Sequence, residues 1–437
     1  MRTHIATGCL GGAWSTVVTG IVFTWYGNAV GMTKITWGIL GALGAWIVLV
    51  QPLGAVLASR LGVRKPIWWT FALMERLMRL LGYIGSFLVW RAGLPGAWSI
   101  LLVTTLVSLV VGNLALAIWW GWLTAIIPQE VQGAFWGRRD TWISVAVIAV
   151  LVPATVLMDR IPADVKLPAV LGILVATSLM GFVDVLWHGT IPEPPMPAER
   201  TRASLRQVLI PLRDRRFRPW LTFAASWNFS MQLGGSLCLL YFLENLGLKN
   251  NMLGAAIAVN VVGLVGSILS ARRLGRLVDR WGPRRVLMVG HLFWSLFPAI
   301  WLFALPGTAV FWVGLASTIG GIFPTAANNA ALKLVTRFPA PEQSAMYMAA
   351  SNSVANIAGG LGSLVAGVFL QVMGDWSVGV GRLTLSAFPV LFIASFLLRS
   401  ASAIVLVPRV REQAGRDEER PVLLPLFFGL PIKRRRG

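Results

Sequence analysis

Long apolar runs, separated by short loops that carry most of the charge, constrain this chain more than any other feature. A helix needs about 20 predominantly apolar residues to cross the hydrocarbon of a bilayer, and twelve runs of the sequence meet or approach that length. Only 13% of the residues are charged, against about 25% in a typical soluble domain. The pattern predicts an all-α integral membrane protein with twelve transmembrane helices.

The predicted spans fall into two sets of six. The first set covers residues 8–30, 36–59, 66–90, 97–127, 141–158 and 167–187. The second set covers residues 217–244, 251–270, 286–305, 308–335, 344–373 and 383–406. The longest polar gap lies between the sets, so we predict an N-terminal bundle over 1–188, a linker over 189–216, a C-terminal bundle over 217–406 and a basic tail over 407–437.

Arginine and lysine are concentrated in the loops that follow the even-numbered spans. Cytoplasmic loops of membrane proteins carry an excess of these residues, so we expect a multi-pass protein of the cytoplasmic (inner) membrane with the linker and both termini in the cytoplasm. The formal net charge of +21 follows from this topology, and anionic lipids at the cytoplasmic face are its expected partners. We expect no nucleic-acid partner.

Residues typical of metal sites and of catalysis are sparse. Cys9 and Cys238 each lie inside an apolar run, and with three scattered histidines they give neither a metal-ligand spacing nor a disulfide framework. No nucleotide-binding loop or nucleophile–base set stands out. We therefore expect no cofactor, no metal and no enzymatic activity.

The tail combines an apolar, proline-containing segment over 421–431 with the basic residues 433–436. It is too short to span a bilayer. It is equally typical of a segment resting at the membrane interface and of a disordered tail.

One charged segment between two apolar runs has a specific pattern, which reads Gly275-Arg-Leu-Val-Asp279-Arg280-Trp-Gly282-Pro-Arg284-Arg285. The order and spacing of its glycines, aspartate and arginines resemble the signature loop of the major facilitator superfamily, a family of twelve-helix secondary transporters. A weaker copy begins at Ala55, an offset of 220 residues, with Ser59 in place of the aspartate. A second echo pairs residues 132–136 with residues 343–347. The two echoes predict a fold of two pseudo-symmetric six-helix bundles.

The loop over 128–140 is similar to that of a poorly characterised bacterial branch of the same superfamily. It keeps Gly137, Arg138 and Arg139 of the branch pattern, while Gln132 and Ala134 replace two of its arginines.

The resemblance implies a secondary active transporter, a permease that moves a small solute by alternating access. It also implies that Asp279 acts as a latch, meeting the positive N-terminal end of the fifth span near Arg139. The alternative is that the loop arginines only maintain topology. The expected gating residues are Gly275, Asp279, Arg280, Gly282, Arg284, Arg285 and Arg139.

The third span contains the charge cluster Glu75, Arg76 and Arg79. Glu75 and Arg79 are four residues apart on a helix and are expected to neutralise one another, which leaves Arg76 to pair elsewhere. Ionisable groups at this depth are functional candidates, here for proton coupling or for anchoring an anionic substrate, and a purely structural ion pair is an equal alternative. Asp184 is a weaker coupling candidate because it lies near the end of its helix.

The resemblance further implies that the first, fourth, seventh and tenth spans contact substrate. Their polar and aromatic residues at mid-depth are Thr16, Thr19, Trp25, Asn113, Trp119, Asn228, Gln232, Asn328 and Asn329. Hydrogen bonding between helices is the ordinary alternative for each of them. We expect a monomer that transports a small molecule, and the rival interpretation is a membrane sensor or envelope assembly factor with the same fold.

Overall fold

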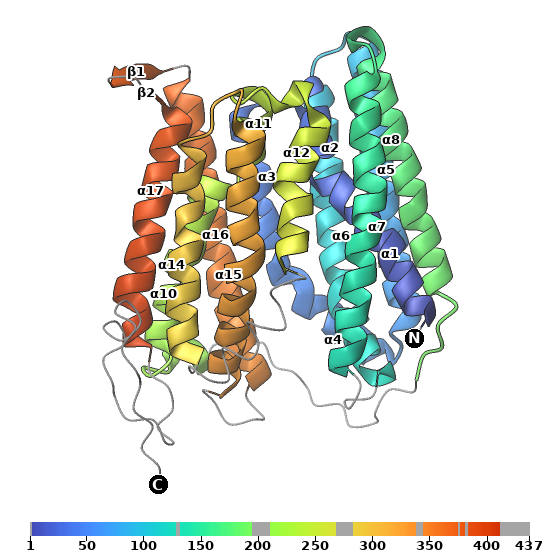
Figure 1. Cartoon of the computed structure of the whole chain (residues 1–437). Coiled ribbons are helices and arrows are strands. Elements are labelled where there is room, and N and C mark those ends of the chain that lie inside the picture. The colour runs from blue at the N-terminus through green and yellow to red at the C-terminus, as the bar shows by residue number, and fades with distance from the viewer. Residues whose placement is uncertain are drawn as a thin grey trace.

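A computed structural model describes residues 2–127, 132–194, 210–267, 283–337, 344–374, 376–380 and 383–410. The structure consists mainly of long helices, which run side by side and roughly parallel to one another (Figure 1). Each of the twelve predicted spans has a helical counterpart, and the prediction of an all-α membrane fold is confirmed. The predicted domain boundaries stay a prediction.

The helices of the first half, which follow the first six predicted spans, are α1 (Arg2–Thr19), α2 (Ile21–Ala29), α3 (Lys34–Ile47), the 3₁₀ turn η1 (Val48–Val50), α4 (Gln51–Leu61), α5 (Lys65–Arg91), α6 (Ala97–Ile126), α7 (Gln132–Arg160) and α8 (Ala163–His188).

The second half begins with α9 (Ile210–Arg213), α10 (Arg218–Gly235), α11 (Cys238–Glu244), the 3₁₀ turn η4 (Leu248–Asn250), α12 (Met252–Ala256) and the π-helix η5 (Ile257–Val261), after which the helix continues to Ser267. It goes on with α14 (Pro283–Trp301), α15 (Ala309–Arg337), α16 (Ser344–Met373), the strands β1 (Ser377–Val380) and β2 (Leu383–Ser386), α17 (Ala387–Ala401), the π-helix η7 (Ser402–Leu406) and the 3₁₀ turn η8 (Val407–Arg409).

Local chemistry explains several helix ends. The Thr33 hydroxyl accepts a hydrogen bond from the backbone N–H of Thr36, and Thr36 Oγ1 accepts one from the N–H of Thr33, so a capping box begins α3. Pro52 lacks a backbone donor, and the chain passes through η1 just before it. Gly62, at φ +71°, ends α4 in the left-handed conformation that glycine adopts without strain.

Two predicted boundaries were wrong. α7 begins at Gln132, nine residues before the predicted start at 141, so Arg139 and Asp140 lie in a helix and not in a loop. A search for apolar runs of about 20 residues detects only the apolar part of a helix. The helix α7 begins earlier, in a polar segment of the sequence. At the other end, residues 383–386 pair with β1 as an antiparallel hairpin, with Ser377 opposite Ser386, and α17 begins only at Ala387.

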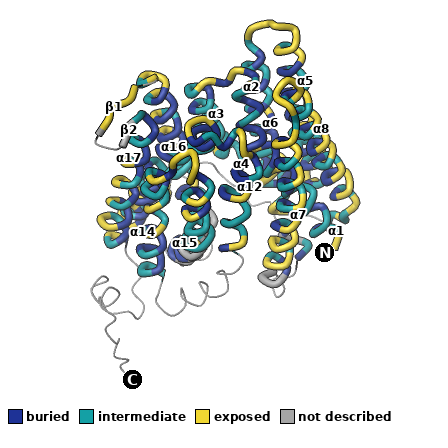
Figure 2. The backbone as a smooth tube through the Cα atoms, turned by 45° about the horizontal axis from the view of Figure 1, so that its top comes forward, coloured by how far each residue is buried: buried dark blue, intermediate teal, exposed yellow. Residues whose placement is uncertain are grey.

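The surface agrees with a lipid environment. Seven helices of the described chain are long and apolar enough to cross a membrane, and two shorter apolar helices accompany them. Large apolar side chains are exposed, among them Leu88, Val103, Phe311 and Leu397. Figure 2 shows exposed residues along many of the long helices. In water such a surface would drive association, but in lipid it is the expected exterior.

Each half has its own helix contacts. In the first half α1 packs against α7 and α8, and α5 packs against α6 and α8; in the second half α10 packs against α16 and α17, and α14 against α15 and α17. The halves meet where α3 packs on α16, α7 on α12 and α2 on α11. We call the side where α1 begins the terminal face, and the side with the α2–α3 and α5–α6 turns the opposite face (Figure 1).

Candidate functional site

A cavity of about 610 Å³ lies between the two halves. α1 and α7 line it from the first half, while η5, its helical continuation, α14 and α15 line it from the second half. Most of the lining residues lie near the middle of their helices. They are Gly12, Ser15, Thr16, Ile143, Ser144, Val147, Val259, Asn260, Gly263, Leu264, Ser267, Phe297, Ser317, Gly320 and Gly321.

Glycines give the cavity its shape. A Cβ atom on Gly320 would lie 1.9 Å from Cζ of Phe297, so the bare backbone of α15 leaves room for the aromatic ring. A Cβ on Gly12 would lie 2.5 Å from Cγ2 of Ile143, so α1 approaches α7 closely at this point. The walls therefore combine bare backbone, one aromatic ring, short polar side chains and the aliphatic side chains of Ile143, Val147, Val259 and Leu264.

The predicted substrate residues lie mostly elsewhere. Thr16 lines the cavity. Among the residues that the structure describes, the lining includes none of Thr19, Trp25, Asn113, Trp119, Asn228, Gln232 and Asn328, and the side chain of Asn329 is outside the described part.

Several of these predicted residues bond to protein groups. The amide of Gln51 donates to Oδ1 of Asn113 at 2.8 Å, and Asn228 donates to the Ala224 carbonyl of its own helix at 2.9 Å. Their assignment to substrate stays a prediction. Ser15, Ser144, Asn260 and Ser317 line the cavity but were not predicted, although Asn260 is an isolated amide within an apolar run.

A buried charge cluster lies beside the cavity, inside the first half. The Arg76 guanidinium forms an ion pair with Glu75 on the same helix and, at 3.4 Å, with Asp184 on α8. It also lies 3.9 Å above the ring of Trp14 on α1. Arg76 and Asp184 are 9% and 8% exposed. Three helices thus meet around one guanidinium that forms ion pairs with two carboxylates.

Arg79 does not pair with Glu75, so that prediction was wrong. Its Nε donates to Ser108 Oγ at 3.0 Å, and its Nη1 donates to the Val18 carbonyl at 3.4 Å. The four-residue spacing puts Glu75 and Arg79 on one helix face, but the hydrogen-bond partners of Arg79 are neutral groups of α1 and α6.

Asp184 belongs to the cluster, although its place near a helix end had suggested a minor role. A single aspartate in an otherwise apolar helix was the signal for it. Glycines make room for both carboxylates, because a Cβ on Gly11 would lie 2.5 Å from Oδ2 of Asp184 and a Cβ on Gly112 would lie 2.6 Å from Cδ of Glu75.

α1 separates the cluster from the cavity. Gly11 faces Asp184, whereas the adjacent Gly12 lines the cavity, and successive residues of an α-helix point about 100° apart. The charges therefore do not line the cavity. A shift of α1 would alter the surroundings of both.

The expected gating residues are only partly described. Gly275, Asp279, Arg280 and Gly282 lie outside the described residues. Arg284 and Arg285 lie in the first turn of α14, and Arg284 donates to the carbonyl of Pro408.

Arg139 lies in the second turn of α7. It packs over the rings of Trp119 and Trp136, with its Cζ 5.4 Å from each ring centroid, and pairs with Asp140 at 3.6 Å. The latch between Asp279 and this region stays a prediction.

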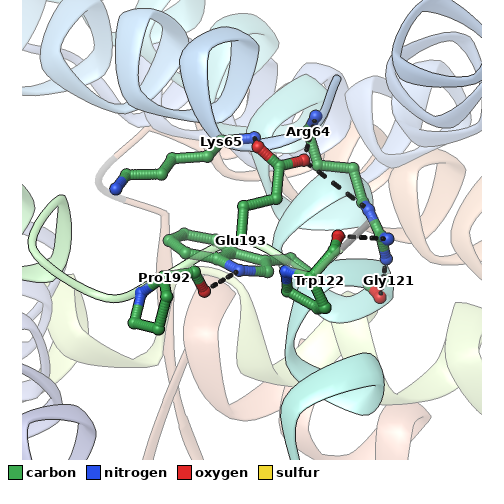
Figure 3. A network of polar contacts seen from close by, with 7 residues as sticks. Arg64, Lys65, Gly121, Trp122, Pro192 and Glu193 are labelled. Atoms are coloured by element: carbon green, nitrogen blue, oxygen red, sulfur yellow. Dashed lines mark hydrogen bonds and ion pairs between the residues drawn. The ribbon is translucent and has the colours of Figure 1, made fainter. Parts of the chain in front are cut away.

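The turn between α4 and α5, which is the first copy of the signature loop, has an acidic partner from another segment. Carboxylate oxygens of Glu193, just after α8, accept from the backbone N–H of Arg64 at 2.6 Å and of Lys65 at 3.2 Å (Figure 3). Arg64 in turn donates to the Gly121 carbonyl at 2.7 Å, and Trp122 Nε1 donates to the Pro192 carbonyl at 3.2 Å. Glu193 thus supplies the anion at the N-terminus of α5 that Ser59 cannot provide.

Replacing Glu193 with glutamine is expected to lower the free energy of unfolding by about 1–2 kcal/mol, because two charge-assisted hydrogen bonds to backbone amides are weakened. Denaturant unfolding of the purified protein in detergent measures this. Asp164→Asn, an exposed acidic residue in the first turn of α8, is the control and should have a smaller effect. Equal effects of the two substitutions would contradict the role of Glu193.

The halves are joined by contacts toward the opposite face. α3 and α16 touch at Gly38 and Gly367, where a Cβ on Gly38 would lie 2.7 Å from the Cα of Gly367. Ser363 Oγ donates to the Gly38 carbonyl at 3.2 Å. The Asp159 carboxylate at the end of α7 accepts from the backbone N–H groups of Met252 and Leu253 at 2.6 and 2.8 Å, which caps α12 across the interface.

Comparison with known proteins agrees with this architecture. Residues 273–435 match the family model described as Major Facilitator Superfamily. No curated protein sequence matches the chain.

Solved structures match over nearly the whole length. A mutant of the nucleoside transporter NupG is 12% identical with a TM-score of 0.70, and the alignment covers 94% of this chain and 99% of that one. The xylose transporter XylE from E. coli, in a partially occluded inward open conformation, is 13% identical with a TM-score of 0.66, covering 95% and 98%. A bacterial homolog of the human lysosomal transporter Spinster, inward-facing and occupied, is 15% identical with a TM-score of 0.61, covering 94% and 93%.

At these identities the structural matches establish the fold. The sequence match to the Major Facilitator Superfamily model lies within the second half of the chain, over residues 273–435.

Proposed function

We propose that the protein is a secondary transporter that moves a small solute across the cytoplasmic membrane by alternating access. The observation that carries this proposal is the cavity between the halves, which helices of both halves line near their midpoints. A site at the interface of two repeats, near the middle of the membrane, is the arrangement that rocking of the halves exposes to each side in turn.

The contacts at the opposite face hold the two halves together there, and in this proposal they close the cavity on that side in one state of the transport cycle. The Gly38–Gly367 approach and the Asp159 cap on α12 join the halves there. Asn28 also donates to Glu244 at 3.3 Å, and Lys34 donates to the Gly374 carbonyl at 3.3 Å. To release solute on that side the halves must separate at these contacts, and they are weak enough individually to be broken in each cycle.

The proposed orientation follows from the basic loops. Arg60 lies in the last turn of α4, Arg64 and Lys65 follow that helix, and Arg213, Arg215 and Arg216 precede α10, all at the terminal face. Positive loops favour the cytoplasm, so the terminal face is cytoplasmic in this proposal, in contact with anionic lipids. We propose a monomer, because the cavity is complete within one chain.

The candidates for proton coupling are the two carboxylates of the Glu75–Arg76–Asp184 cluster. Protonation of Asp184 would release it from Arg76 and change the packing around Gly11 of α1, and protonation of Glu75 would do the same around Gly112 of α6. An imposed pH gradient should then accelerate flux in the parent protein and not in Glu75→Gln. An unchanged response in that variant would remove Glu75 as a coupling site.

Counterflow in proteoliposomes tests the transport function. Liposomes loaded with an unlabelled solute should transiently accumulate the same labelled solute, with saturable kinetics and without ATP. Absence of saturable flux across a broad metabolite panel, together with stabilisation by one of its members, would instead favour the sensor with the same fold.

A further inference from the structure

We infer that the cavity binds an uncharged solute that carries several hydroxyl groups on a ring, and that Asn260 is a specificity-determining residue for it. The inference rests on the proposed transport function, because it assigns the substrate class of the same cavity. Four observations support it: the absence of charge in the described lining, its hydrogen-bonding groups, the π-helix that presents Asn260, and the aromatic wall.

Charge is absent from the lining that the structure describes, in which no residue is acidic or basic. A carboxylate or ammonium group loses its hydration on entering such a site and finds no opposite charge to compensate. The charges of Asp184 and Arg76 lie on the other side of α1 and are paired with one another. The cavity therefore favours an uncharged solute over an organic anion or cation.

The polar lining favours a solute with hydrogen-bond donors. Thr16 and Ser144 donate their hydroxyl protons to carbonyls of their own helices, at 3.0 and 2.8 Å. Each then offers only oxygen lone pairs to a ligand. Ser15, Asn260 and Ser317 make no side-chain hydrogen bond with any other described residue, so they are available to a ligand. Hydroxyl groups can donate to the first pair and both donate to and accept from the other three.

Asn260 stands out because of its backbone. It lies in the π-helix Ile257–Val261, which widens the helix by one residue per turn on the side of the cavity. Single π-helical turns inside α-helices are rare and occur frequently at functional sites. The Asn260 amide offers two donors and an acceptor, which suits a pair of neighbouring hydroxyl groups.

The aromatic wall accounts for the ring. Phe297 packs against α15 at Gly320 and is the aromatic residue of the described lining. A ring with hydroxyl groups at its edge has an apolar face for Phe297 and a polar rim for Asn260 and the serines. The volume of about 610 Å³ is in the range of roughly 300–1,000 Å³ that small-molecule sites have.

The test compares neutral ring solutes with charged counterparts of similar shape. Xylose, inositol and uridine represent the first group, and glucosamine, glucuronate and uridine monophosphate the second. Stabilisation of the purified protein against thermal unfolding measures binding, and counterflow in proteoliposomes measures transport. At least one neutral probe should bind and exchange, and its charged counterpart should do neither. Comparing xylose, inositol and uridine shows whether the hydroxyl-bearing ring that the cavity binds is that of a sugar, a polyol or a nucleoside.

Two substitutions test whether binding of the neutral probe depends on Asn260. Asn260→Ala should weaken the binding of the active neutral probe about tenfold or more, the loss expected when hydroxyl partners are left unpaired. Asn356→Ala is the matched control, since Asn356 is half-buried on α16, bonds only within its own helix among the described residues and does not line the cavity. It should leave binding unchanged. Normal thermal stability of both unliganded variants excludes misfolding.

The outcomes separate the two proposals. Asn260-dependent binding of a neutral probe without exchange supports the assignment of the cavity and contradicts transport. Exchange of charged probes at rates equal to those of neutral ones, or unchanged binding in Asn260→Ala, overturns the inference and leaves transport standing. Failure of every neutral probe to bind or exchange also overturns it.

Discussion

Replacing Arg76 with methionine is expected to lower the free energy of unfolding by about 3–5 kcal/mol, the range found when one partner of a buried ion pair is removed. The substitution keeps an unbranched, apolar side chain beside Trp14, although a shorter one, and removes the charge. Glu75 and Asp184 then lie close together with no cation between them, and each is mostly buried. Loss of stability in Arg76→Met therefore reports the electrostatics of the cluster more than its packing.

Arg91→Met is the control for this experiment. Arg91 is exposed at the end of the same helix, so its loss should change the unfolding free energy by no more than about 0.5 kcal/mol. Neutralising both acids as well, in Glu75→Gln/Arg76→Met/Asp184→Asn, should restore most of the stability. A triple variant as unstable as Arg76→Met would show that the ion pairs do not explain the loss.

Replacing Gly38 with valine is expected to slow transport about 10- to 100-fold. Overpacking the contact between α3 and α16 destabilises the state closed at the opposite face by about 1–3 kcal/mol. The first added carbon already conflicts with the Gly367 backbone, at 2.7 Å from its Cα, and a helix backbone cannot move aside as a flexible side chain can. The halves could then no longer close at the opposite face. Counterflow and the thermal stability of purified protein are the measurements.

Gly172→Val is the matched control for Gly38→Val. Gly172 lies in α8, is exposed, and a Cβ there would meet nothing within 4 Å. The same change of residue should leave its flux within about twofold of the parent, as surface substitutions usually do. Comparable losses of flux in the two variants would show that the contact between Gly38 and Gly367 is not a gate.

Much of the fold was predictable because membranes limit the choice of structure. Hydrocarbon leaves only helices and closed barrels as spanning structures, so apolar runs of suitable length predicted helices that the structure contains. The ends were less predictable. The start of α7 at Gln132 and the β1–β2 hairpin lie where the chain leaves the apolar region, and there composition no longer restricts the backbone.

The site was harder to predict because it depends on which helix faces meet. Glu75, Arg76 and Asp184 were each recognised as buried charges, but their partners depend on glycines 11 and 112 of α1 and α6, which admit the carboxylates. Asn260 belongs to the cavity through a π-helical turn, and periodicity based on 3.6 residues per turn cannot anticipate such a turn.

The central claim is that one cavity between the halves is reached from each side of the membrane in turn. Labelling of a cysteine at position 317 tests it directly, in a Ser317→Cys chain whose Cys9 and Cys238 are replaced by alanine. Ser317 lines the cavity from α15. A membrane-impermeant thiol reagent should label this cysteine from either side of oriented proteoliposomes, and Gly38→Val should restrict labelling to the opposite face. Labelling from one side only, unchanged by Gly38→Val, would contradict alternating access.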